Sequence, residues 1–464
     1  MAGDSVKVIK ERIKEKHPVN QKNKKNLNAA EELIKKISNR QVNVGVIGLG
    51  YVGLPLAVEM ARKDFKVTGF DISENKVKLV NAGKSDIDDI KDADVAAIVK
   101  SGHLKATTDA SLIARMDVVM ICVPTPLSKT KDPDVSYILA AVKWVQNNLK
   151  KGALVVLEST TYPGTTEDLI LPLLSEKNRK VGVDFFLAFS PERVDPGNAH
   201  YNTQNTPRVV GGITPGCTEV AKFFYEQTIS KVIPLSSTQA AEMVKLLENT
   251  FRSVNIGLVN EYALMCDKLN LNIWEIIDAA SSKPFGFMPF YPGPGLGGHC
   301  IPIDPHYLSW KLKSVNYLAR FIELAGDINS HMPEYVVDRI GELLNKKLSK
   351  AFTKANILIL GIAYKRDIKD VRESPALDVM KLLETKGAKV SYNDPHVPKI
   401  KWNGGELKSR KLTESAIKEA DLVVIITDHS AFDYQWIVDN AVAVFDTRNA
   451  AKNVKKARNK IELL

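Results

Sequence analysis

Apolar residues are distributed along the chain in short runs that are separated by longer amphipathic stretches. The runs over residues 42–47, 66–70, 118–122 and 154–157 are of strand length, which predicts four strands. An amphipathic stretch over 52–63 predicts a helix between the first two strands. Alternation of apolar strands with helices is typical of a parallel, doubly wound α/β sheet.

A second passage near the C-terminus repeats this scheme. Strands are predicted over 356–360, 389–392 and 422–426, with an amphipathic helix over 376–386. An aspartate precedes the strand at 422, as another aspartate precedes the strand at 118 in the first passage. We therefore expect an α/β protein with two Rossmann-like, doubly wound parallel-sheet domains.

The passage between the two sheets is helical. Ser236 and Gln239 resemble a capping box, and helix-compatible sequence follows as far as Leu269, interrupted only by Gly257. At a rise of 1.5 Å per residue such a helix is about 45 Å long. We expect it to form a long-helix central domain that joins the two sheets and offers a surface for a homodimer.

The net charge of +10 over 464 residues raises the question of a nucleic-acid partner. Residues 1–40 carry eleven basic and five acidic side chains, and residues 451–464 carry five basic and one acidic, so the body between them has no net charge. The two basic ends are therefore interpreted as solvated helical tails, with 1–40 as an N-terminal extension, and no nucleic-acid partner is expected.

Composition also bears on the compartment. No apolar run reaches the ~20 residues of a membrane span, and the Lys-rich start does not resemble a secretory signal. The four cysteines are scattered, which favours reduced thiols over disulfides or a zinc site. A cytoplasmic protein without a membrane span or a metal site is expected.

A glycine-rich turn follows the first predicted strand. The sequence Gly48-Leu49-Gly50-Tyr51-Val52-Gly53 opens the first helix, and Asp71 ends the next strand. Glycines at this spacing let the backbone approach a pyrophosphate, and the acidic residue favours an unphosphorylated ribose, hence NAD over NADP. The alternative is a tight strand-to-helix turn that holds no ligand.

A second glycine-rich run, over 293–298, leads through His299 to Cys300. Asp304 and Pro305 are interpreted as the N-cap and the first residue of a helix whose positive end would favour a Cys300 thiolate. The alternatives are a buried, inert thiol and an aspartate that only caps the helix.

Further candidate groups lie at strand ends and on the long helix. Lys245 and Asn249 are four residues apart, so they share one helix face and could stabilise an oxyanion, although an exposed lysine is the simpler interpretation. Glu158-Ser159-Thr160 and Ser190-Pro191-Glu192 each end a predicted strand, where ligand groups gather in such sheets.

Six motifs in order resemble the UDP-glucose/GDP-mannose dehydrogenase family over residues 42–450: G-L-G-Y-V-G-L-P, E-S-T, S-P-E, K-x-x-x-N, G-G-H-C-x-x-x-D and G-x-A-Y-K-x-x-x-x-D-x-R-E-S-P. The resemblance implies an NAD-binding domain over 41–236, a central dimerisation domain over 237–344 and a UDP-sugar-binding domain over 345–464. It further implies two successive oxidations of a sugar C6 alcohol by NAD, with Cys300 attacking the aldehyde and water hydrolysing the resulting thioester.

The same resemblance implies the other catalytic roles. Lys245 and Asn249 would stabilise the alkoxide and the oxyanion. Asp304 would be the general base, relaying a proton through water or Lys245, and Thr160 and Glu192 would position and activate the hydrolytic water. The implied cofactor-binding residues are Gly48, Gly50, Tyr51, Val52, Gly53, Asp71, Lys76, Thr125 and Arg372. The implied substrate-binding residues are Arg193, Gly295, Gly297, Gly298 and Lys365.

Departures from the glucose-oxidising pattern bear on the substrate. Residues 193–197, Thr161-Tyr162-Pro163 and His299 replace F-L-x-E-G, V-P-V and a Ser or Ala. These departures resemble the branch that acts on N-acetylated sugars, which implies UDP-N-acetylglucosamine first, UDP-N-acetylmannosamine or UDP-N-acetylgalactosamine next, and UDP-glucose last. A role in polysaccharide synthesis follows by association. The competing hypotheses are a two-electron dehydrogenase of the β-hydroxyacid type and a non-catalytic sugar-nucleotide sensor.

Overall fold

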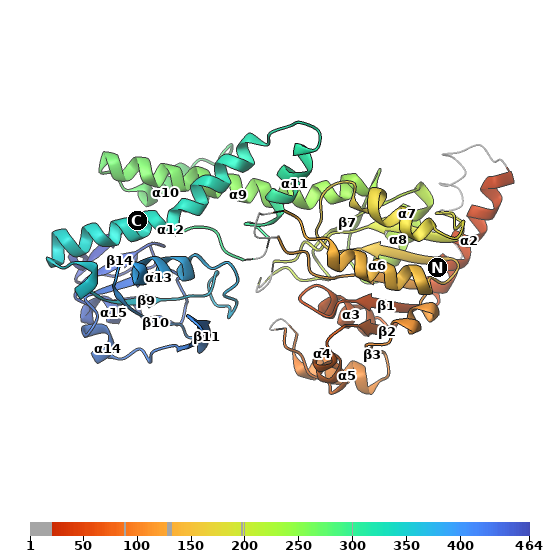
Figure 1. Ribbon diagram of the computed structural model, residues 1–464, viewed down its shortest axis with the longest axis horizontal. Coiled ribbons are helices and arrows are strands. Elements are labelled where there is room, and N and C mark those ends of the chain that lie inside the picture. The colour runs from red at the N-terminus through yellow and green to blue at the C-terminus, as the bar shows by residue number, and fades with distance from the viewer. Residues whose placement is uncertain (1–20, 88–89, 128–131, 196–197, 199, 299) are drawn as a thin grey trace. The chain divides into compact units, whose positions relative to one another are not determined.

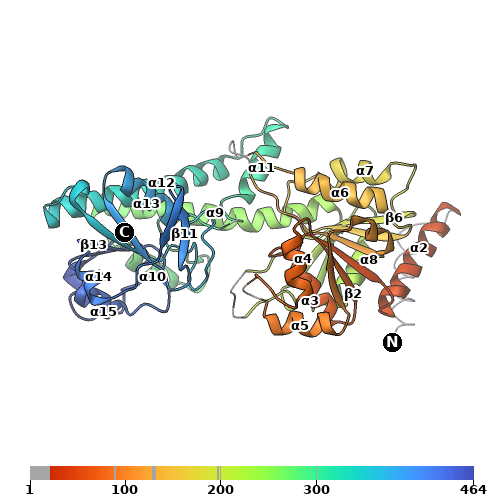
Figure 2. The ribbon, with the colours of Figure 1, turned by 60° about the horizontal axis from the view of Figure 1, so that its bottom comes forward.

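The computed structural model describes residues 21–87, 90–127, 132–195, 198, 200–298 and 300–464. The chain divides into two compact units, Met1–Leu247 and Glu248–Leu464, and each contains a predominantly parallel sheet. The predicted class, two Rossmann-like parallel-sheet domains with long helices between them in the sequence, is confirmed (Figures 1 and 2).

The sheet of the first unit has the strand order β3-β2-β1-β4-β5-β6-β7-β8. Neighbouring strands are parallel except β6 and β7, which are antiparallel. The first six strands thus have the 3-2-1-4-5-6 order of a Rossmann fold, with the topological switch point between β1 and β4. The strands are β1 Asn43–Ile47, β2 Lys66–Phe70, β3 Leu104–Thr107, β4 Val118–Ile121, β5 Ala153–Leu157, β6 Phe185–Phe189, β7 Arg208–Gly212 and β8 Val232–Leu235.

Helices cover both faces of this sheet, which is why its strands are apolar at nearly every position. On one face, the Val44 and Val46 side chains join a core with α2, α3 and α8, and on the other, Ile47 joins a core with α6 and α7. The helical segments are α2 Gln21–Ser38, α3 Gly53–Arg62, α4 Glu74–Asn81, α5 Asp92–Lys100, η1 Ala110–Arg115, α6 Ser136–Asn148, the π-helix η2 Thr165–Ile170, α7 Leu171–Ser175 and α8 Pro215–Tyr225.

The helix α2 corrects the interpretation of residues 1–40 as a solvated extension. Ala30, Leu33, Ile34 and Ile37 are buried in the core of the first sheet, where α2 packs on α8. Their i, i+3, i+4, i+7 spacing is that of an amphipathic helix. The end of this predicted extension is therefore part of the folded unit, while residues 1–20 lie outside the described residues.

The long helix α9, Thr238–Leu269, begins in the first unit and ends in the second. Its length agrees with the sequence, but the predicted capping box is wrong. The Ala240 N–H donates to the Ser237 hydroxyl at 3.1 Å, and Gln239 instead donates to Glu167. The cap is therefore Ser237, one residue later than predicted.

The sheet of the second unit has the order β10-β9-β13-β14-β15, and all its pairs are parallel. The switch point lies between β9 and β13. A two-stranded antiparallel hairpin, β11–β12, accompanies it. The strands are β9 Asn356–Leu360, β10 Lys389–Asn393, β11 Lys399–Trp402, β12 Gly405–Lys408, β13 Leu422–Ile425, β14 Val444–Asp446 and β15 Ile461–Leu463.

Helices also cover both faces of the second sheet. Ile357 and Ile359 belong to a core with α12 and α13, whereas Leu358 and Leu360 belong to a core with α14 and α15. The helical segments are α10 Ile273–Ser281, α11 Asp304–Lys313, α12 Arg320–Leu348, η3 Phe352–Lys354, α13 Pro375–Thr385, α14 Glu414–Lys418, α15 Tyr434–Asn440 and η4 Arg458–Lys460.

The C-terminal segment also differs from the solvated helical tail predicted for it. Residues 461–463 form β15, the edge strand beside β14. Glu462 on this strand pairs with Arg339 and Lys347 of α12. The segment that looked like a basic tail thus completes the second sheet. Among the residues that the structure describes, no helix combines the length and hydropathy needed to cross a membrane.

Candidate functional site

The predicted dinucleotide turn lies between β1 and α3, at the switch point of the first sheet. Gly48 has φ +90°, and a Cβ there would lie 2.7 Å from the Cys122 carbonyl oxygen. A Cβ on Gly53 would lie 1.8 Å from the Gly48 carbonyl oxygen, whereas one on Gly50 would meet no atom within 4 Å. The outer glycines are therefore required by the turn itself. The open side at Gly50 fits the close approach of a pyrophosphate.

Asp71 follows β2 and holds this turn. Its Oδ2 accepts the Leu49 N–H and its Oδ1 the Ser73 N–H, both at 2.9 Å. The half-buried carboxylate still has lone pairs for ribose hydroxyls, as expected for NAD. Lys76 is ion-paired with Asp86.

The remaining predicted cofactor residues of this unit lie at the ends of elements. Tyr51 is exposed, Val52 precedes α3 without a side-chain cap, and Thr125 follows β4. The fit to a dinucleotide thus comes mainly from the turn and Asp71.

A buried arginine that the sequence analysis missed connects two of the predicted motifs. Arg208, 4% exposed at the start of β7, pairs with Glu158 at 2.5 Å and with Glu192 at 2.6 Å. Burial lowers the pKa of an arginine, but here the two carboxylates outweigh it and raise the pKa of Arg208. Tyr225 also donates to Glu158. The sequence did contain a signal for this ion-pair network, namely a charged residue in an otherwise apolar strand. A buried arginine requires partners of opposite charge.

Glu192, predicted to activate water, has further partners on its other oxygen. Glu192 Oε1 accepts the Arg193 N–H at 2.8 Å and the Val194 N–H at 3.0 Å. Arg193 itself donates from Nη1 to the Pro207 carbonyl at 2.8 Å. Glu192 therefore fixes the loop that carries the predicted substrate residue Arg193.

Lys245 and Thr160, to which the resemblance gave separate roles, are in contact. Lys245 Nζ donates to Thr160 Oγ1 at 2.5 Å, so α9 presents this ammonium group to the segment that follows β5. The simpler interpretation, a lysine exposed on a long helix, is wrong. An ammonium group in this position is suited to stabilising a developing oxyanion.

Asn249 and Asp304 are also in contact, within the second unit. The Asn249 amide nitrogen donates to Asp304 Oδ2, and its oxygen accepts from Arg252. Asn249 and Asp304 are both buried. Arg252, which the sequence analysis did not single out, fixes the direction of the Asn249 amide, so that its nitrogen faces the carboxylate.

Cys300 lies just before α11 and is half-buried, whereas Cys122, Cys217 and Cys266 are buried. Burial raises the pKa of Cys122 and of Cys217, which suits inert thiols. The Cys300 carbonyl accepts the N–H groups of Ile303 and Asp304 at 3.1 and 2.8 Å. Cys300 is thus the accessible thiol of the four, next to the first turn of a helix.

The start of α11 corrects the predicted cap. Asp304 is the first residue of the helix, Pro305 the second, and the N-cap Ile303 makes no side-chain hydrogen bond. The Asp304 carboxylate binds Asn249 instead. The alternative in which Asp304 only caps the helix is therefore wrong, and the carboxylate remains a candidate general base.

The glycines of the 293–298 run approach the protein itself. A Cβ on Gly297 or Gly298 would lie 2.6 or 2.9 Å from Tyr364, and one on Gly295, at φ +129°, would lie 3.2 Å from Pro375. Gly298 N–H also donates to the Arg372 carbonyl. Close packing on these segments explains these glycines without a ligand. His299 lies outside the described residues.

Basic side chains gather at the carboxyl edge of the second sheet, where ligands bind in such folds. Lys365 follows β9, and Arg366 pairs with Asp428 after β13. Arg448, which the sequence analysis missed, follows β14. Its guanidinium packs so closely on Gly293 that a Cβ at that position would lie 2.3 Å from Nη1.

Arg372, predicted to reach a cofactor, forms a bidentate pair with Asp370.

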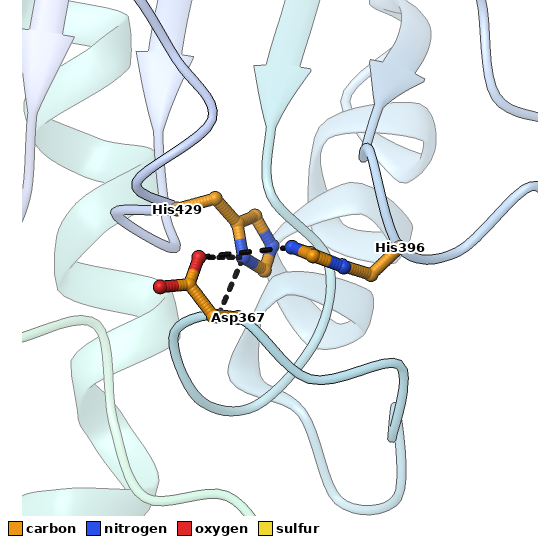
Figure 3. A group of neighbouring side chains, drawn as sticks. All are labelled: Asp367, His396 and His429. Carbon is orange, nitrogen blue, oxygen red and sulfur yellow. Dashed lines mark hydrogen bonds and ion pairs between the residues drawn. The ribbon is translucent and has the colours of Figure 1, made fainter. Parts of the chain in front are cut away.

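Asp367, His396 and His429 bring three possible metal-ligand atoms together at the same edge (Figure 3). His429 is fully buried, its Nδ1 accepts the Asp367 N–H at 2.9 Å, and its Nε2 donates to Asp394 at 3.0 Å. Both ring nitrogens are thus used within the protein. His429 and Asp367 therefore form a hydrogen-bonded anchor for the loop that contains Lys365.

Family models match three successive parts of the chain. Residues 42–229 match the NAD binding domain, residues 239–331 the central domain, and residues 358–453 the UDP binding domain of the UDP-glucose/GDP-mannose dehydrogenase family.

Individual relatives agree. An NDP-N-acetyl-D-galactosaminuronic acid dehydrogenase of Ralstonia nicotianae is 36% identical over 400 residues, which are 84% of this chain and 91% of that protein. A UDP-N-acetyl-D-mannosamine dehydrogenase of Methanococcus maripaludis is 36% identical over 440 residues, 90% of this chain and 96% of that one. The solved structure of a UDP-D-ManNAc dehydrogenase from Pyrococcus horikoshii has a TM-score of 0.82 at 33% identity and covers 91% and 98% of the two chains. The protein therefore belongs to the UDP-glucose/GDP-mannose dehydrogenase family of NAD-dependent nucleotide sugar dehydrogenases.

Proposed function

We propose that the protein oxidises the C6 alcohol of a UDP-linked 2-acetamido sugar to a carboxylate, through a covalent bond to Cys300. The observation that carries this proposal is an accessible thiol directly before a helix whose first carboxylate, Asp304, is bound by Asn249. A dehydrogenase that only makes an aldehyde or a ketone has no use for such a thiol.

The turn at Gly48–Gly53 and Asp71 would hold two NAD molecules in succession, and each of them would accept one hydride. The first oxidation leaves an aldehyde at C6. The Cys300 sulfur then adds to this carbon, which forms a C–S bond and places negative charge on the former carbonyl oxygen. Loss of a second hydride from the same carbon gives a thioester, and water displaces the thiol to yield the acid.

Basic and polar groups on α9 control the charge in these steps. We propose that Lys245 donates to the alkoxide and the oxyanion, with Thr160 fixing its ammonium group. The Asn249 amide nitrogen carries two hydrogens, so that it can donate to the same oxygen while it holds Asp304. Asp304 accepts the proton of the C6 hydroxyl, directly or through water.

Hydrolysis of the thioester requires a placed water. We propose that Thr160 and Glu192 hold it, with Arg208 keeping the Glu192 carboxylate in a single orientation. Glu192 accepts two backbone N–H groups and the guanidinium. It therefore acts in this proposal mainly by orienting the water.

The relatives guide the choice of sugar. Those at 36% identity are named as dehydrogenases of UDP-N-acetyl-D-mannosamine or NDP-N-acetyl-D-galactosaminuronic acid. These names favour UDP-N-acetylmannosamine over the UDP-N-acetylglucosamine that the motifs suggested first. Lys365 and Arg448 are proposed to bind the nucleotide diphosphate, because they provide positive charge after β9 and β14. Supply of a uronic acid for polysaccharide synthesis, in the cytosol, stays a prediction.

We also propose a homodimer formed through the helical part of the second unit. Large apolar side chains are exposed along α9 and around the start of α12, and exposed apolar patches mark protein–protein interaction sites. They are Phe251, Leu258, Tyr262, Met265, Leu269, Tyr317, Leu318, Phe321 and Leu324. Analytical ultracentrifugation should give twice the 51.3 kDa chain mass, and Phe321→Asp should shift the mass toward the monomer.

A panel of UDP-sugars and GDP-mannose tests the function. We expect two NADH per molecule of an N-acetylated UDP-hexosamine, with a uronic acid product identified by its mass. Cys300→Ser should lower acid production by about 10³-fold or more. Cys266→Ser, the same change at a buried thiol, should keep turnover. One NADH per sugar, or full acid production by Cys300→Ser, would exclude the mechanism, and nucleotide-sugar binding without any NADH would indicate a sensor.

A further inference from the structure

A buried carboxylate on α9 connects the helix to the loop that contains Thr160. Glu242 is 1% exposed and lies three residues before Lys245, on the same helix face. Its Oε2 accepts the Gly164 N–H at 2.6 Å. Its Oε1 accepts the Thr166 N–H at 3.0 Å and the Thr166 hydroxyl at 2.7 Å.

The segment that Glu242 holds is itself tightly fixed. Thr161, Thr165 and Thr166 are buried, and the hydroxyls of Thr161 and Thr165 are 2.6 Å apart. Thr165 also donates to the Tyr162 carbonyl at 2.8 Å. Thr160 is the chain neighbour of Thr161, so a displacement at 164–166 would reach it through the hydrogen bond between Thr161 and Thr165.

Burying a carboxylate between a helix and a loop costs desolvation free energy, whereas an apolar side chain could fill the same space without this cost. What the carboxylate adds is direction. Three hydrogen bonds to one charged group fix both the distance and the rotation of α9 relative to the loop. Burial raises the pKa of the Glu242 carboxyl, against the hydrogen bonds that lower it.

We propose that Glu242 is a positioning residue for the reaction, which sets the contact between Lys245 and Thr160. The helix holds the loop at two points, one helical turn apart, namely Glu242 with 164–166 and Lys245 with Thr160. This inference rests on the proposed oxyanion role of Lys245. The first contact restrains the geometry of the second.

Glu242→Gln tests this positioning with little change in volume. Glutamine has one acceptor oxygen, so its NH2 group must face the N–H of Gly164 or of Thr166. We expect kcat to fall about 10- to 100-fold, because small misplacements of catalytic groups have effects of this size. The KM for NAD should stay within twofold. Glu167→Gln is the matched control, because Glu167 joins the same two elements through an exposed contact with Gln239 at 2.9 Å. It should leave kcat within twofold.

A double-mutant cycle separates positioning from simple stabilisation. If Glu242 acts through the Lys245–Thr160 contact, Glu242→Gln should cost much less in a Thr160→Val background than in the wild type. Thr166→Val removes a single hydrogen bond to Glu242, and it keeps the test available should Glu242→Gln fail to fold. Its expected loss in kcat is a few-fold.

Two results would overturn the inference. One is a lowered melting temperature with unchanged kcat in both Glu242→Gln and Thr166→Val, and the other is full additivity in the cycle. Failure of the proposed function is recognised separately, since the wild-type protein would then give no NADH with any nucleotide sugar.

Discussion

The turn after the first strand of each sheet is held by an aspartate that follows the second strand. In the first unit, Gly48 has φ +90° and Asp71 accepts the N–H of Leu49. In the second, Gly361 has φ +78°, and Asp394 accepts the N–H groups of Ile362 and Ala363 at 2.7 and 3.1 Å. The two halves thus use the same local chemistry.

The surroundings of the two aspartates differ. Asp71 is half-buried beside a turn whose middle glycine, Gly50, is open. Asp394 is 3% exposed, and the buried His429 donates to the same oxygen that holds the turn. A carboxylate occupied in this way cannot also receive ribose hydroxyls. The comparison shows how one Rossmann-like half is suited to a dinucleotide while its repeat uses the equivalent carboxylate for structure.

The largest expected effect is the loss of stability on Asp394→Ala. The change removes the acceptor of four backbone N–H groups and of the His429 Nε2–H. Buried donors left without an acceptor should lower the free energy of unfolding by about 3–5 kcal/mol. Urea denaturation measures it. A loss below about 1 kcal/mol would contradict the structural role assigned to this carboxylate.

The matched change Asp71→Ala should affect binding more than folding. Only two N–H groups lose their acceptor, and one of them belongs to the exposed Ser73, so the stability loss should be about 1 kcal/mol. The Kd for NAD should rise about 10- to 100-fold, since hydrogen bonds to a charged group contribute roughly 1.5–3 kcal/mol. Calorimetric titration with NAD tests this. Equal stability losses in both aspartate variants would remove the distinction between the halves.

Acid should weaken the structural contribution of Asp394. Burial disfavours the Asp394 carboxylate, but His429 and the backbone N–H groups outweigh it and lower the pKa of Asp394 below its ordinary value. Its contribution is therefore present above the unfolded pKa, ~3.9, and is lost as the pH falls through the lower folded value. Urea midpoints between pH 5 and pH 2 should fall less steeply in Asp394→Asn than in the wild type. Parallel slopes would contradict this account.

The smallest expected change in stability is that of Gly50→Ala. A Cβ at this position meets no atom within 4 Å, and the φ of Gly50 is not positive, so the free energy of unfolding should change by less than about 0.5 kcal/mol. The methyl group would occupy the open side of the turn and raise the KM for NAD. An unchanged KM would mean that the dinucleotide does not approach the turn at Gly50.

The repeat between the halves could be recognised in the sequence beyond the strands themselves. Asp117 and Asp421 precede equivalent strands, and each accepts the N–H of the residue that opens the neighbouring strand, Asn43 or Asn356, at 3.0 and 2.9 Å. Each is also paired with a lysine, Lys150 or Lys350. Local spacing was sufficient to recognise the repeat at these positions, because neighbouring parallel strands keep a fixed register.

At the two ends of the chain, the composition led to wrong predictions of solvated tails. The apolar positions of α2 have helical spacing, but the surrounding lysines made the segment look solvated, and the basic C-terminal segment gave no sign that residues 461–463 complete a sheet. A short edge strand is specified by the neighbour it pairs with, and that neighbour is set by tertiary packing.

The sequence by itself determined the order of elements, the dinucleotide turn, the lysine and asparagine of α9, and the cysteine before α11, because each depends on residues close together in the chain. Only the tertiary structure decided which charges meet. Arg208 pairs with Glu158, which lies fifty residues earlier. Asp304 binds Asn249 and does not cap its helix, and Asp394 accepts a hydrogen bond from His429. Such partners are set by strand order and helix packing, which local patterns restrict to a few arrangements without choosing among them.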